Sequence, residues 1–416
     1  MCKVTHAWRP GLVWLWRNRG PGMAALYFDH AATTPCDPRV QAVLLRALAE
    51  ENGNPHSTTH ASGIRAAHMV EHARAQVATL LGVEAREIVF TSGATESNNL
   101  AIKGAARHLA AQGSPRRRII TAATEHKCVL QSVADLAYEG FEPVVLPVNP
   151  LGQVEPEVLA RALAEAPTAV VSIAAANNET GVLQDLATLG ALVVQAGALL
   201  HTDLAQAAGK IALDLHALPV ALASISSHKL YGPKGAGALF VRRRPRVRLT
   251  PLFSGGGQER GLRSGTLPGF LLAGFGEACQ IASTDMARDG AHLAKVQAVF
   301  LARLGPQLPG CVVNAQEAVR LPGIFSLRLP PDLRAAEVLA VMPGLEVSLG
   351  SACSSAELAP SYVLEAIGLS FDEAGRSLRL SPGRFTSTAE AERAADSLAQ
   401  AALQVRATPR RPMPAA

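Results

Sequence analysis

One segment combines a lysine with polar neighbours at the predicted end of a buried strand. SISSHKLYGPKG spans residues 224–235 and contains Ser226, His228 and Lys229 ahead of a Gly-Pro turn. An amine at such a strand end can form an imine with a carbonyl compound. Most lysines beside a Gly-Pro turn are solvated loop residues, so this segment alone does not establish a catalytic lysine.

Other predicted strand ends carry residues suited to an anion, a flat ring and a cation. FTSGATESNN (90–99) follows a strand and opens a helix, where backbone N–H groups and the helix dipole favour an anion. His126 and Asn178 each follow a further strand, and Asp203 and Gln206 follow another. A carboxylate flanked by apolar strand residues is costly without a cationic partner.

One cofactor would satisfy all of these groups. The protonated ring nitrogen of pyridoxal phosphate would pair with Asp203, its ring face would accept His126, and its aldehyde would react with Lys229. The residues suited to its phosphate are Thr95, Ser226 and His228. We therefore predict a pyridoxal-phosphate site with Lys229 as the covalent attachment point.

Alternating strands and helices would position these residues. The predicted strands span 87–90, 118–122, 142–148, 168–173, 198–203, 221–226 and 237–241. Helical patterns between most of them are typical of a mostly parallel sheet with helices on both faces. Ligands bind outside the carboxyl ends of such strands. The expected fold class is therefore α/β, with a seven-stranded sheet and the site at its carboxyl edge.

The flanking regions predict further helices and a second, smaller α/β domain. Helices are expected at 38–51, 63–81, 268–305 and 388–406, the first capped by Asp37 and the last opened by a Ser387–Glu390 capping box. The predicted organisation is an extension or overcalled start at 1–22, a segment packing with the small domain at 23–38, a large cofactor-binding domain at 39–285, a small domain at 286–405 and a disordered tail at 406–416.

Composition excludes several classes of protein. The 416 residues are 48% hydrophobic and 18% charged, which indicates a globular protein with a substantial core. Four of its five net positive charges come from Lys3, Arg9, Arg17 and Arg19, so no nucleic-acid surface is inferred. No transmembrane segment is expected. The six cysteines are scattered without a CxxC pair, which favours reduced thiols in the cytoplasm and no metal site.

A series of motifs also resembles a known family. The motifs are GNPHSTTHASG, EIVFTSGATESNNLAIKG, TEHKCVL, NNETGV, HTDLAQ, SSHKLYGPKG, ERGLRSGTLP, GSACSS and LRLSPGRFT. Together they resemble the cysteine desulfurases, which are class V, fold-type I pyridoxal-phosphate enzymes, and most of all the iron–sulfur-assembly and nitrogen-fixation branch. The resemblance extends from about Tyr27 to Gln400.

The resemblance assigns roles by position. It implies a cofactor site with His126 stacked on the ring, Asp203 at the ring nitrogen and Lys229 on the aldehyde. The other residues that it places around the cofactor are Ala94, Thr95, Asn178, Gln206, Ser226 and His228. It implies that Thr266 reaches the phosphate of a neighbouring subunit, which requires a homodimer. It also implies that Arg379, with Asn178, binds the substrate carboxylate; Arg384 lies nearby and could be confused with it.

The remaining candidate for a reactive residue is Cys353, in the segment SLGSACSSAELAP. Its small neighbours before Pro360 are typical of an exposed, mobile loop, in which a thiol can ionise and react. In the resembled family this cysteine removes sulfur from L-cysteine, leaves L-alanine, and passes the sulfur as a persulfide to an acceptor protein. His126 is the expected general acid/base. The other cysteines after residue 30, at 36, 128, 279 and 311, are interpreted as structural.

Three alternatives share some of these residues. A selenocysteine lyase would use the same fold and cofactor, and a class V aminotransferase would need Lys229 but not Cys353. A non-catalytic sulfur-relay scaffold would need no lysine at all. The acceptor could be an iron–sulfur scaffold or a thiolation carrier, and the sequence does not choose between them.

Overall fold

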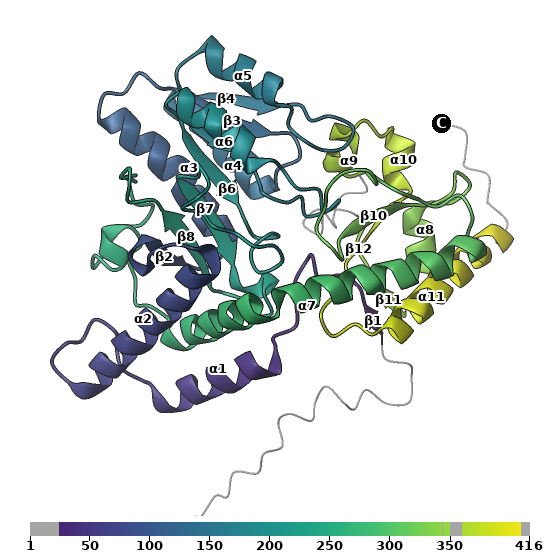
Figure 1. Ribbon diagram of the computed structural model, residues 1–416, viewed down its shortest axis with the longest axis horizontal. Helices are drawn as coiled ribbons and strands as arrows, with labels where there is room; N and C mark the ends of the chain where they lie inside the picture. Colours follow the sequence, from purple (N-terminus) through teal and green to yellow (C-terminus); the bar gives the residue numbers. More distant parts are fainter. Residues whose placement is uncertain (1–24, 343, 350–359, 409–416) are drawn as a thin grey trace, which may run out of the picture.

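The computed structural model describes residues 25–342, 344–349 and 360–408 of the chain. The predicted N-terminal extension, Cys353 and residues 409–416 of the predicted tail lie outside these ranges. Within them, no helix is both long and apolar enough to cross a membrane. The described residues form a larger and a smaller α/β unit that share one long helix (Figure 1).

Seven strands of the described chain form the larger sheet, in the order β2-β8-β7-β6-β5-β3-β4. Strand β8 is antiparallel to both of its neighbours, whereas the pairs from β7 to β4 are parallel. The bounds are β2 Ile88–Thr91, β3 Arg118–Ala122, β4 Glu142–Leu146, β5 Thr168–Ser172, β6 Leu199–Asp203, β7 Leu222–Ser226 and β8 Gly237–Val241. The predicted mostly parallel, seven-stranded sheet is confirmed.

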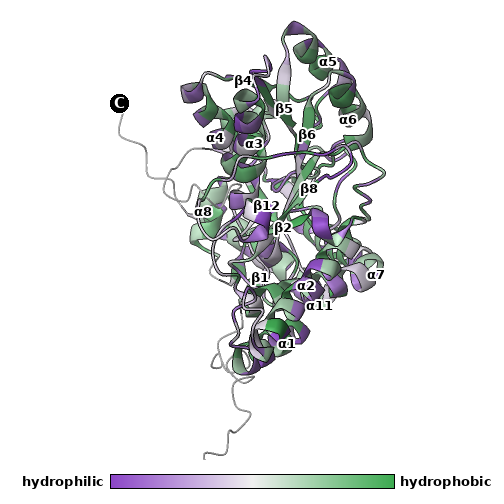
Figure 2. Cartoon of the chain, turned by 90° about the vertical axis from the view of Figure 1, so that its left-hand side faces the viewer, coloured by the Kyte–Doolittle hydropathy of each residue, from purple (hydrophilic) through white to green (hydrophobic). Residues whose placement is uncertain are grey.

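Both faces of this sheet are buried, because helices pack on each. Val89 and Ile119 belong to one apolar cluster, whereas their neighbours Phe90 and Ile120 belong to another, as the alternation of side chains along a strand requires. The helices are α3 Ala94–Ala111, α4 Lys127–Asp135, α5 Pro156–Glu165 and α6 Leu186–Gln195. Figure 2 shows the strands of the sheet largely in the hydrophobic colour.

The parallel register brings the polar strand ends together. Asp203 at the end of β6 is paired with Ser224 of β7, and Thr121 of β3 is paired with Ser172 of β5. The segments that follow β3, β5, β6 and β7 therefore leave the sheet at one edge, where the sequence predicts the site.

The long helix α7 (Gly269–Gln307) connects the two units (Figure 1). It packs on α1 (Pro38–Glu50) and α2 (Ala61–Leu81) beside the larger sheet and on α11 (Thr388–Ala407) in the smaller unit. The predicted domain boundary after residue 285 falls inside this continuous helix.

The helix ends follow the predicted signals. Asp37 caps α1 by accepting the backbone N–H of Arg39 at 3.0 Å, and Gly82 ends α2 in the left-handed conformation at φ 65°. Ser387 and Glu390 form the predicted capping box of α11. That helix runs to Ala407 and so includes the first residues of the predicted tail.

The smaller unit contains an antiparallel sheet of order β12-β10-β9 and a separate core around Phe300 and Phe325. Strand β1 (Leu26–Tyr27) pairs in parallel with β11 (Leu345–Glu346), which holds the first described residues against this unit. Its other elements are β9 Val312–Val313, β10 Phe325–Arg328, β12 Ser377–Leu380, α8 Ala335–Ala340, α9 Tyr362–Ala366 and α10 Phe371–Gly375. Short 3₁₀ turns in the larger unit are η2 Ala85–Glu87, η3 Leu136–Glu139, η4 Ser227–Lys229 and η5 Glu259–Gly261.

A buried ion pair fixes the Gly-rich loop 254–268 to the larger unit. The carboxylate of Glu259 in η5 accepts two hydrogen bonds from Arg74 of α2 and one from the backbone N–H of Phe90, each 2.7 Å long. The side chains of Arg74 and Glu259 are only 4% and 2% exposed. Glu71 also contacts Arg74, at 3.0 Å, but its side chain is 63% exposed.

We expect Glu259→Ala to lower the free energy of unfolding by roughly 3–5 kcal/mol, because it leaves the buried Arg74 guanidinium with only the exposed Glu71 as an ionic partner. Glu71→Ala removes the exposed partner of the same arginine and should cost less than about 1 kcal/mol. Urea unfolding of both variants measures the difference. Equal effects of the two substitutions would contradict the assignment of this pair as the loop anchor.

Candidate functional site

A cavity of about 530 Å³ lies at the carboxyl ends of β3, β5, β6 and β7. Residues 31–33 of the N-terminal segment and Tyr362 and Arg379 of the smaller unit complete its wall. The predicted site residues on this wall are Ala94, Thr95, His126, Asn178, Asp203, Gln206, Ser226, His228, Lys229 and Arg379. The fold therefore brings together residues that are far apart in the sequence.

Two predicted site residues are not on this wall. Thr266 is exposed on the loop 254–268 and does not line the cavity formed by the described residues of one chain. Cys353 lies outside the described residues. The roles predicted for both stay predictions.

The first turn of α3 forms a cradle at one end of the cavity. Gly93 precedes this helix with φ 154° and ψ −179°, a conformation that residues with a side chain rarely adopt. A Cβ on Gly237 of β8 would lie 2.5 Å from Gly93 Cα, so the two backbones can approach only because residue 237 is a glycine. Ala94 and Thr95 lie on the cavity wall at the N-terminus of the helix, where its dipole favours an anion. The cradle therefore fits a phosphate group.

Ser226 and His228 lie on the wall near the same end of β7. A Cβ built on Gly93 would be 3.7 Å from Ser226 Oγ, so the hydroxyl lies beside the cradle. Nδ1 of His228 is 3.1 Å from Thr33 Oγ1. Burial, with the charges of Lys229, Lys234 and Lys210, lowers the pKa of His228 to about 4. His228 is therefore neutral at physiological pH and can donate a hydrogen bond to an anion.

Asp203 is a buried carboxylate that receives only neutral donors from the described residues. Its side chain accepts a hydrogen bond from Asn98 Nδ2 at 2.7 Å and from the backbone N–H of Ala205 at 2.8 Å, and the residue is 8% exposed. The described residues provide no salt bridge to it. A buried charge of this kind fits a cationic group in the cavity, such as a protonated ring nitrogen.

Lys229 lies in the turn η4, directly after β7. Its Nζ donates to the carbonyl oxygens of Ala31 at 2.5 Å and Ala32 at 2.7 Å. Gln206 donates to the same Ala31 oxygen at 2.9 Å and accepts from Lys210 Nζ at 2.9 Å. These contacts hold the Lys229 amine on the cavity wall, where an aldehyde could reach it.

His126 caps the N-terminus of α4 by accepting the backbone N–H of Cys128 on its Nδ1 at 3.2 Å. Burial lowers the pKa of His126; the carboxylate of Asp203 opposes this, and Lys229 and Lys127 add to it. The imidazole is therefore neutral at physiological pH. Cys128, which the sequence analysis interprets as structural, lies on the cavity wall with its Sγ 3.0 Å from His126 Nδ1, so that interpretation is incomplete.

Arg379 is the arginine that reaches the cavity. It is 2% exposed, and its guanidinium donates to Asp29 Oδ1 at 2.7 Å, Ser348 Oγ at 3.1 Å and the carbonyl oxygen of Asn178 at 3.3 Å. Its Nε is buried and has no partner among the described residues. A buried donor without a partner is unusual in a folded protein and fits an anionic ligand.

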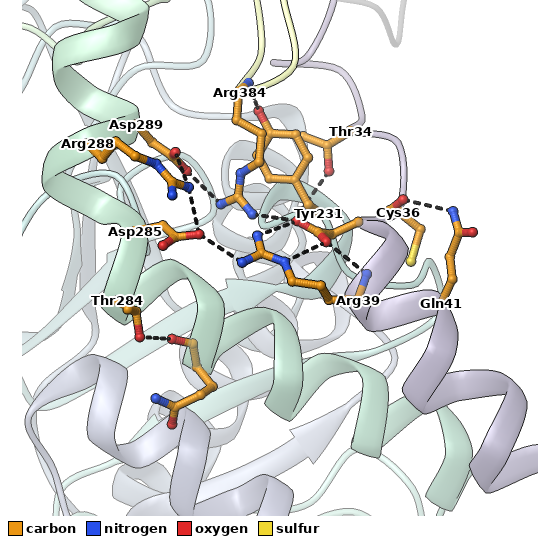
Figure 3. Close-up of polar contacts among 12 residues, drawn as sticks. Thr34, Cys36, Arg39, Gln41, Tyr231, Thr284, Asp285, Arg288, Asp289 and Arg384 are labelled. Carbon is orange, nitrogen blue, oxygen red and sulfur yellow. Dashed lines mark hydrogen bonds and ion pairs between the residues drawn. The ribbon is translucent and has the colours of Figure 1, made fainter.

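Arg384, which could be confused with Arg379 in the sequence, makes its contacts away from the cavity (Figure 3). It forms ion pairs with Asp37 at 3.0 Å and Asp289 at 2.9 Å. Its guanidinium carbon lies 4.1 Å from the centre of the Tyr231 ring. This network ties the N-terminus of α1 and helix α7 to the segment after β12, and the cavity wall does not include Arg384. The choice of Arg379 for an anionic group therefore has structural support.

Several residues around the cavity were not predicted from the sequence. Asn98 lies four residues after Ala94 on α3, a spacing that places both on one face of the helix and could have indicated it. Glu125 immediately precedes His126, and Tyr362 comes from the smaller unit and donates to the Glu125 carbonyl oxygen at 2.7 Å. No sequence signal links Tyr362 to the site, because it depends on how the two units pack.

Glu125 is a buried acid behind the cavity. One carboxyl oxygen accepts the backbone N–H of Ala174 at 2.6 Å, and the other has no partner among the described residues. Burial, with a smaller contribution from the charge of Asp203, raises its pKa to about 8. Glu125 is therefore mostly protonated at neutral pH, which limits the negative charge near Asp203.

Comparisons with known proteins agree with this architecture. The family described as Aminotransferase class-V matches residues 26–393. Cysteine desulfurase IscS of Rickettsia bellii (strain OSU 85-389) is 45% identical over 365 residues, which cover 88% of each chain. The cysteine desulfurase of Homo sapiens is 46% identical over 373 residues, covering 90% of this chain and 80% of that one.

Solved structures show the same similarity. A NifS-like protein superposes with a TM-score of 0.83 at 34% identity and covers 91% of this chain and 100% of its own. DndA from Streptomyces lividans has a TM-score of 0.71 at 39% identity, and the match covers 84% of this chain and 97% of that one. The resemblance to class V enzymes predicted from the motifs is confirmed.

We expect Glu125→Gln to remove a component of the pH dependence of stability. The pKa of Glu125 is raised from its ordinary 4.5 to about 8, so the unfolded chain loses this proton at lower pH than the folded chain. Its contribution to stability is therefore fully present below pH 4.5 and is lost as the pH rises towards 8. The variant should gain stability relative to the parent protein between about pH 5 and pH 9.

Urea unfolding at several pH values measures this gain. Glu157→Gln, on the exposed surface of α5, is the matched control and should leave the pH dependence unchanged. Parallel stability curves for Glu125→Gln and the parent protein would contradict the assignment of a buried, protonated Glu125.

Proposed function

We propose that this chain, which belongs to the aminotransferase class-V family, is a pyridoxal-phosphate-dependent cysteine desulfurase that converts L-cysteine to L-alanine. The observation that carries the proposal is the single cavity that combines Lys229, Asp203 and His126 with the cradle at the start of α3. The similarity to proteins named cysteine desulfurase, over about nine-tenths of the chain, supports this activity over the other class V reactions.

The residues present fit the cofactor. Lys229 would bind its aldehyde, Asp203 would pair with the ring nitrogen, and His126 would lie against the ring. The residues that would surround the phosphate and the rest of the ring are Ala94, Thr95, Asn178, Gln206, Ser226 and His228. Two observations support this fit: Asp203 receives only neutral donors from the described residues, and the backbone at Gly93 has a conformation, φ 154°, that residues with a side chain rarely adopt. When bound, the cofactor withdraws electrons from the substrate α-carbon and so weakens the bonds around it.

The protein side chains would then bind and orient the substrate and move its protons. The Arg379 guanidinium would bind the carboxylate of L-cysteine with its remaining donors, near Asn178. The Lys229 amine would take the proton from Cα and return a proton to the product. His126, close to Asp203 and Lys229, is the group we assign to proton transfer or hydrogen bonding near the departing sulfur.

Cys353 would accept the sulfur. The Cβ–S bond of L-cysteine breaks, an S–S bond forms on Cys353, and a proton replaces sulfur on Cβ, so that a thiol and L-cysteine give a persulfide and L-alanine. The persulfide would then pass its outer sulfur to an acceptor protein, for which an iron–sulfur scaffold and a thiolation carrier are the two candidates.

The active form would be a homodimer. Thr266 is exposed at the end of a loop that the buried Arg74–Glu259 pair holds in place, which suits a residue that completes the phosphate site of a partner subunit. Sedimentation analysis of the loaded protein tests the dimer, and a monomer with full activity would contradict it.

Lys229→Ala and Cys353→Ala should separate cofactor binding from sulfur transfer. We expect Lys229→Ala to lose both the yellow absorbance of the loaded protein and alanine formation. Cys353→Ala should keep the yellow absorbance but release no cysteine-dependent sulfide, because the cofactor site is intact and the sulfur acceptor is missing. Absorbance spectra and parallel alanine and sulfide assays measure this.

The matched control is Cys311→Ala, which removes a half-buried thiol in the core of the smaller unit. It should keep both the absorbance and the sulfide release. Full turnover by Cys353→Ala would remove that cysteine from the mechanism, and a colourless Cys353→Ala protein would show that it supports the cofactor site.

Arg379→Lys should raise KM for L-cysteine roughly 10- to 100-fold, because a lysine keeps the charge but loses a charge-assisted hydrogen bond to the carboxylate. Steady-state kinetics with L-cysteine measure this. The substrate analogue cysteamine, which lacks the carboxylate, is the control, since its reaction with the two proteins should differ little. An unchanged KM for L-cysteine would exclude Arg379 as the carboxylate site.

A further inference from the structure

A chain of hydrogen bonds joins Asp203 to His126 along the wall of the cavity. Asn98 Nδ2 lies 2.7 Å from Asp203 Oδ2 and 3.2 Å from Cys128 Sγ. Cys128 Sγ lies 3.0 Å from His126 Nδ1. The four residues come from β6, α3 and the start of α4, so packing of the sheet against two helices creates the chain.

The direction of each bond follows from chemistry. An amide nitrogen has two hydrogens and no acceptor site, so Asn98 donates to both the carboxylate and the sulfur. Rotating the amide would place its oxygen against the Asp203 carboxylate, which is unfavourable. Asn98 is fully buried, and its Oδ1 has no partner among the described residues. Its orientation is therefore determined by the two acceptors of its nitrogen.

The geometry favours a thiol hydrogen directed at His126, because the other side-chain partners of the sulfur, Asn98 and Thr95, can both donate to it. Nδ1 of His126 already accepts the backbone N–H of Cys128 at 3.2 Å as the cap of α4, so this nitrogen carries a lone pair and no proton. Burial, with the charge of Asp203, raises the pKa of Cys128 to about 12, so its sulfur keeps its hydrogen at physiological pH. The sulfur accepts from Asn98 and donates to His126.

We infer that Asn98 and Cys128 are positioning residues that, with the backbone of α4, hold His126 as a neutral imidazole whose proton is on Nε2. A second ring proton, on Nδ1, would point at two donors, the thiol and the backbone N–H of Cys128. It would also break the cap of α4. The charged groups around the ring are Asp203, Lys229 and Lys127, with the buried Glu125 preceding it. His126 is thus a hydrogen-bond donor through Nε2.

This assignment of the ring proton does not depend on which reaction the protein catalyses, whereas its consequence for catalysis rests on the proposed function. A neutral imidazole with the proton on Nε2 donates a hydrogen bond to the sulfur or to the cofactor. It does not act as a base there until it has given up that proton. His126 would therefore stabilise the departing sulfur as a donor, and Lys229 would carry the base function.

The test uses ¹⁵N-histidine-labelled, cofactor-free full-length protein, with the His126 signals assigned by their loss in His126→Gln. Nuclear magnetic resonance distinguishes protonated from unprotonated ring nitrogens. We expect an unprotonated Nδ1 and a protonated Nε2 at neutral pH. A protonated Nδ1 would overturn the inference, whatever reaction the enzyme catalyses.

Paired variants of Cys128 test its own contribution. Cys128→Ala removes one of the two donors to Nδ1, so the pKa of His126 should rise by roughly half a unit to one unit. Cys128→Ser keeps an O–H donor and should keep the parent value. Equal shifts in both variants, or none in Cys128→Ala, would overturn the role of Cys128.

A kinetic measurement on the loaded protein separates this inference from the proposed function. If both are correct, the pH profile of kcat for L-cysteine should shift in Cys128→Ala in the same direction as the pKa of His126, and should stay in place in Cys128→Ser. If no variant, including the parent protein, releases sulfide, the proposed function fails while the resonance result still decides the inference. If Cys128→Ala shifts the pKa of His126 but leaves the pH profile of kcat in place, the role of His126 in catalysis is overturned and the assignment of its ring proton is not.

Discussion

The buried carboxylate of Asp203 is the constraint on which the site depends. It lies at the end of β6, bound by an amide and a backbone N–H, and the described residues offer it no cation. A charge in this environment is stabilised by a cationic partner, which a ligand in the cavity can provide. The rest of the cavity agrees with a flat, cationic and phosphorylated partner, since a helix N-terminus lies at one end and an amine on the wall.

Desolvation keeps several buried groups at and near the cavity neutral. Burial lowers the pKa of His30, His201 and His228 to about 4, and raises that of Glu125 to about 8. Charged side chains remain on the wall, and those of Asp203 and Arg379 are buried. A bound cofactor and an amino-acid substrate would bring the complementary charges, so that electrostatic complementarity would be completed by the ligands.

The strand ends were predictable because each strand is short, apolar and followed at once by polar residues. Parallel pairing then places Asp203 and Lys229 at one edge without further information. The contacts of Asn98 and Cys128 were not predictable in the same way, because they depend on how α3 and α4 meet over the sheet. The motif pattern favours Arg379 over Arg384 as the carboxylate ligand, and in the structure Asp37 and Asp289 bind Arg384.

Two parts of the site depend on contacts beyond the larger unit of one chain. Thr266 is exposed on an anchored loop, and its predicted role needs a second subunit. The smaller unit contributes Arg379 and Tyr362 to the cavity wall, so the packing of the two units along α7 determines the shape of the substrate side. Under the proposed function, the larger unit would bind the cofactor and both units would bind the substrate.

The most direct test is to load the protein with pyridoxal phosphate, reduce it with borohydride and locate the modified lysine by peptide mass spectrometry. The account predicts a phosphopyridoxyl group on Lys229. Modification of the nearby Lys210 or Lys234 in its place, or no modification of any lysine, would contradict it.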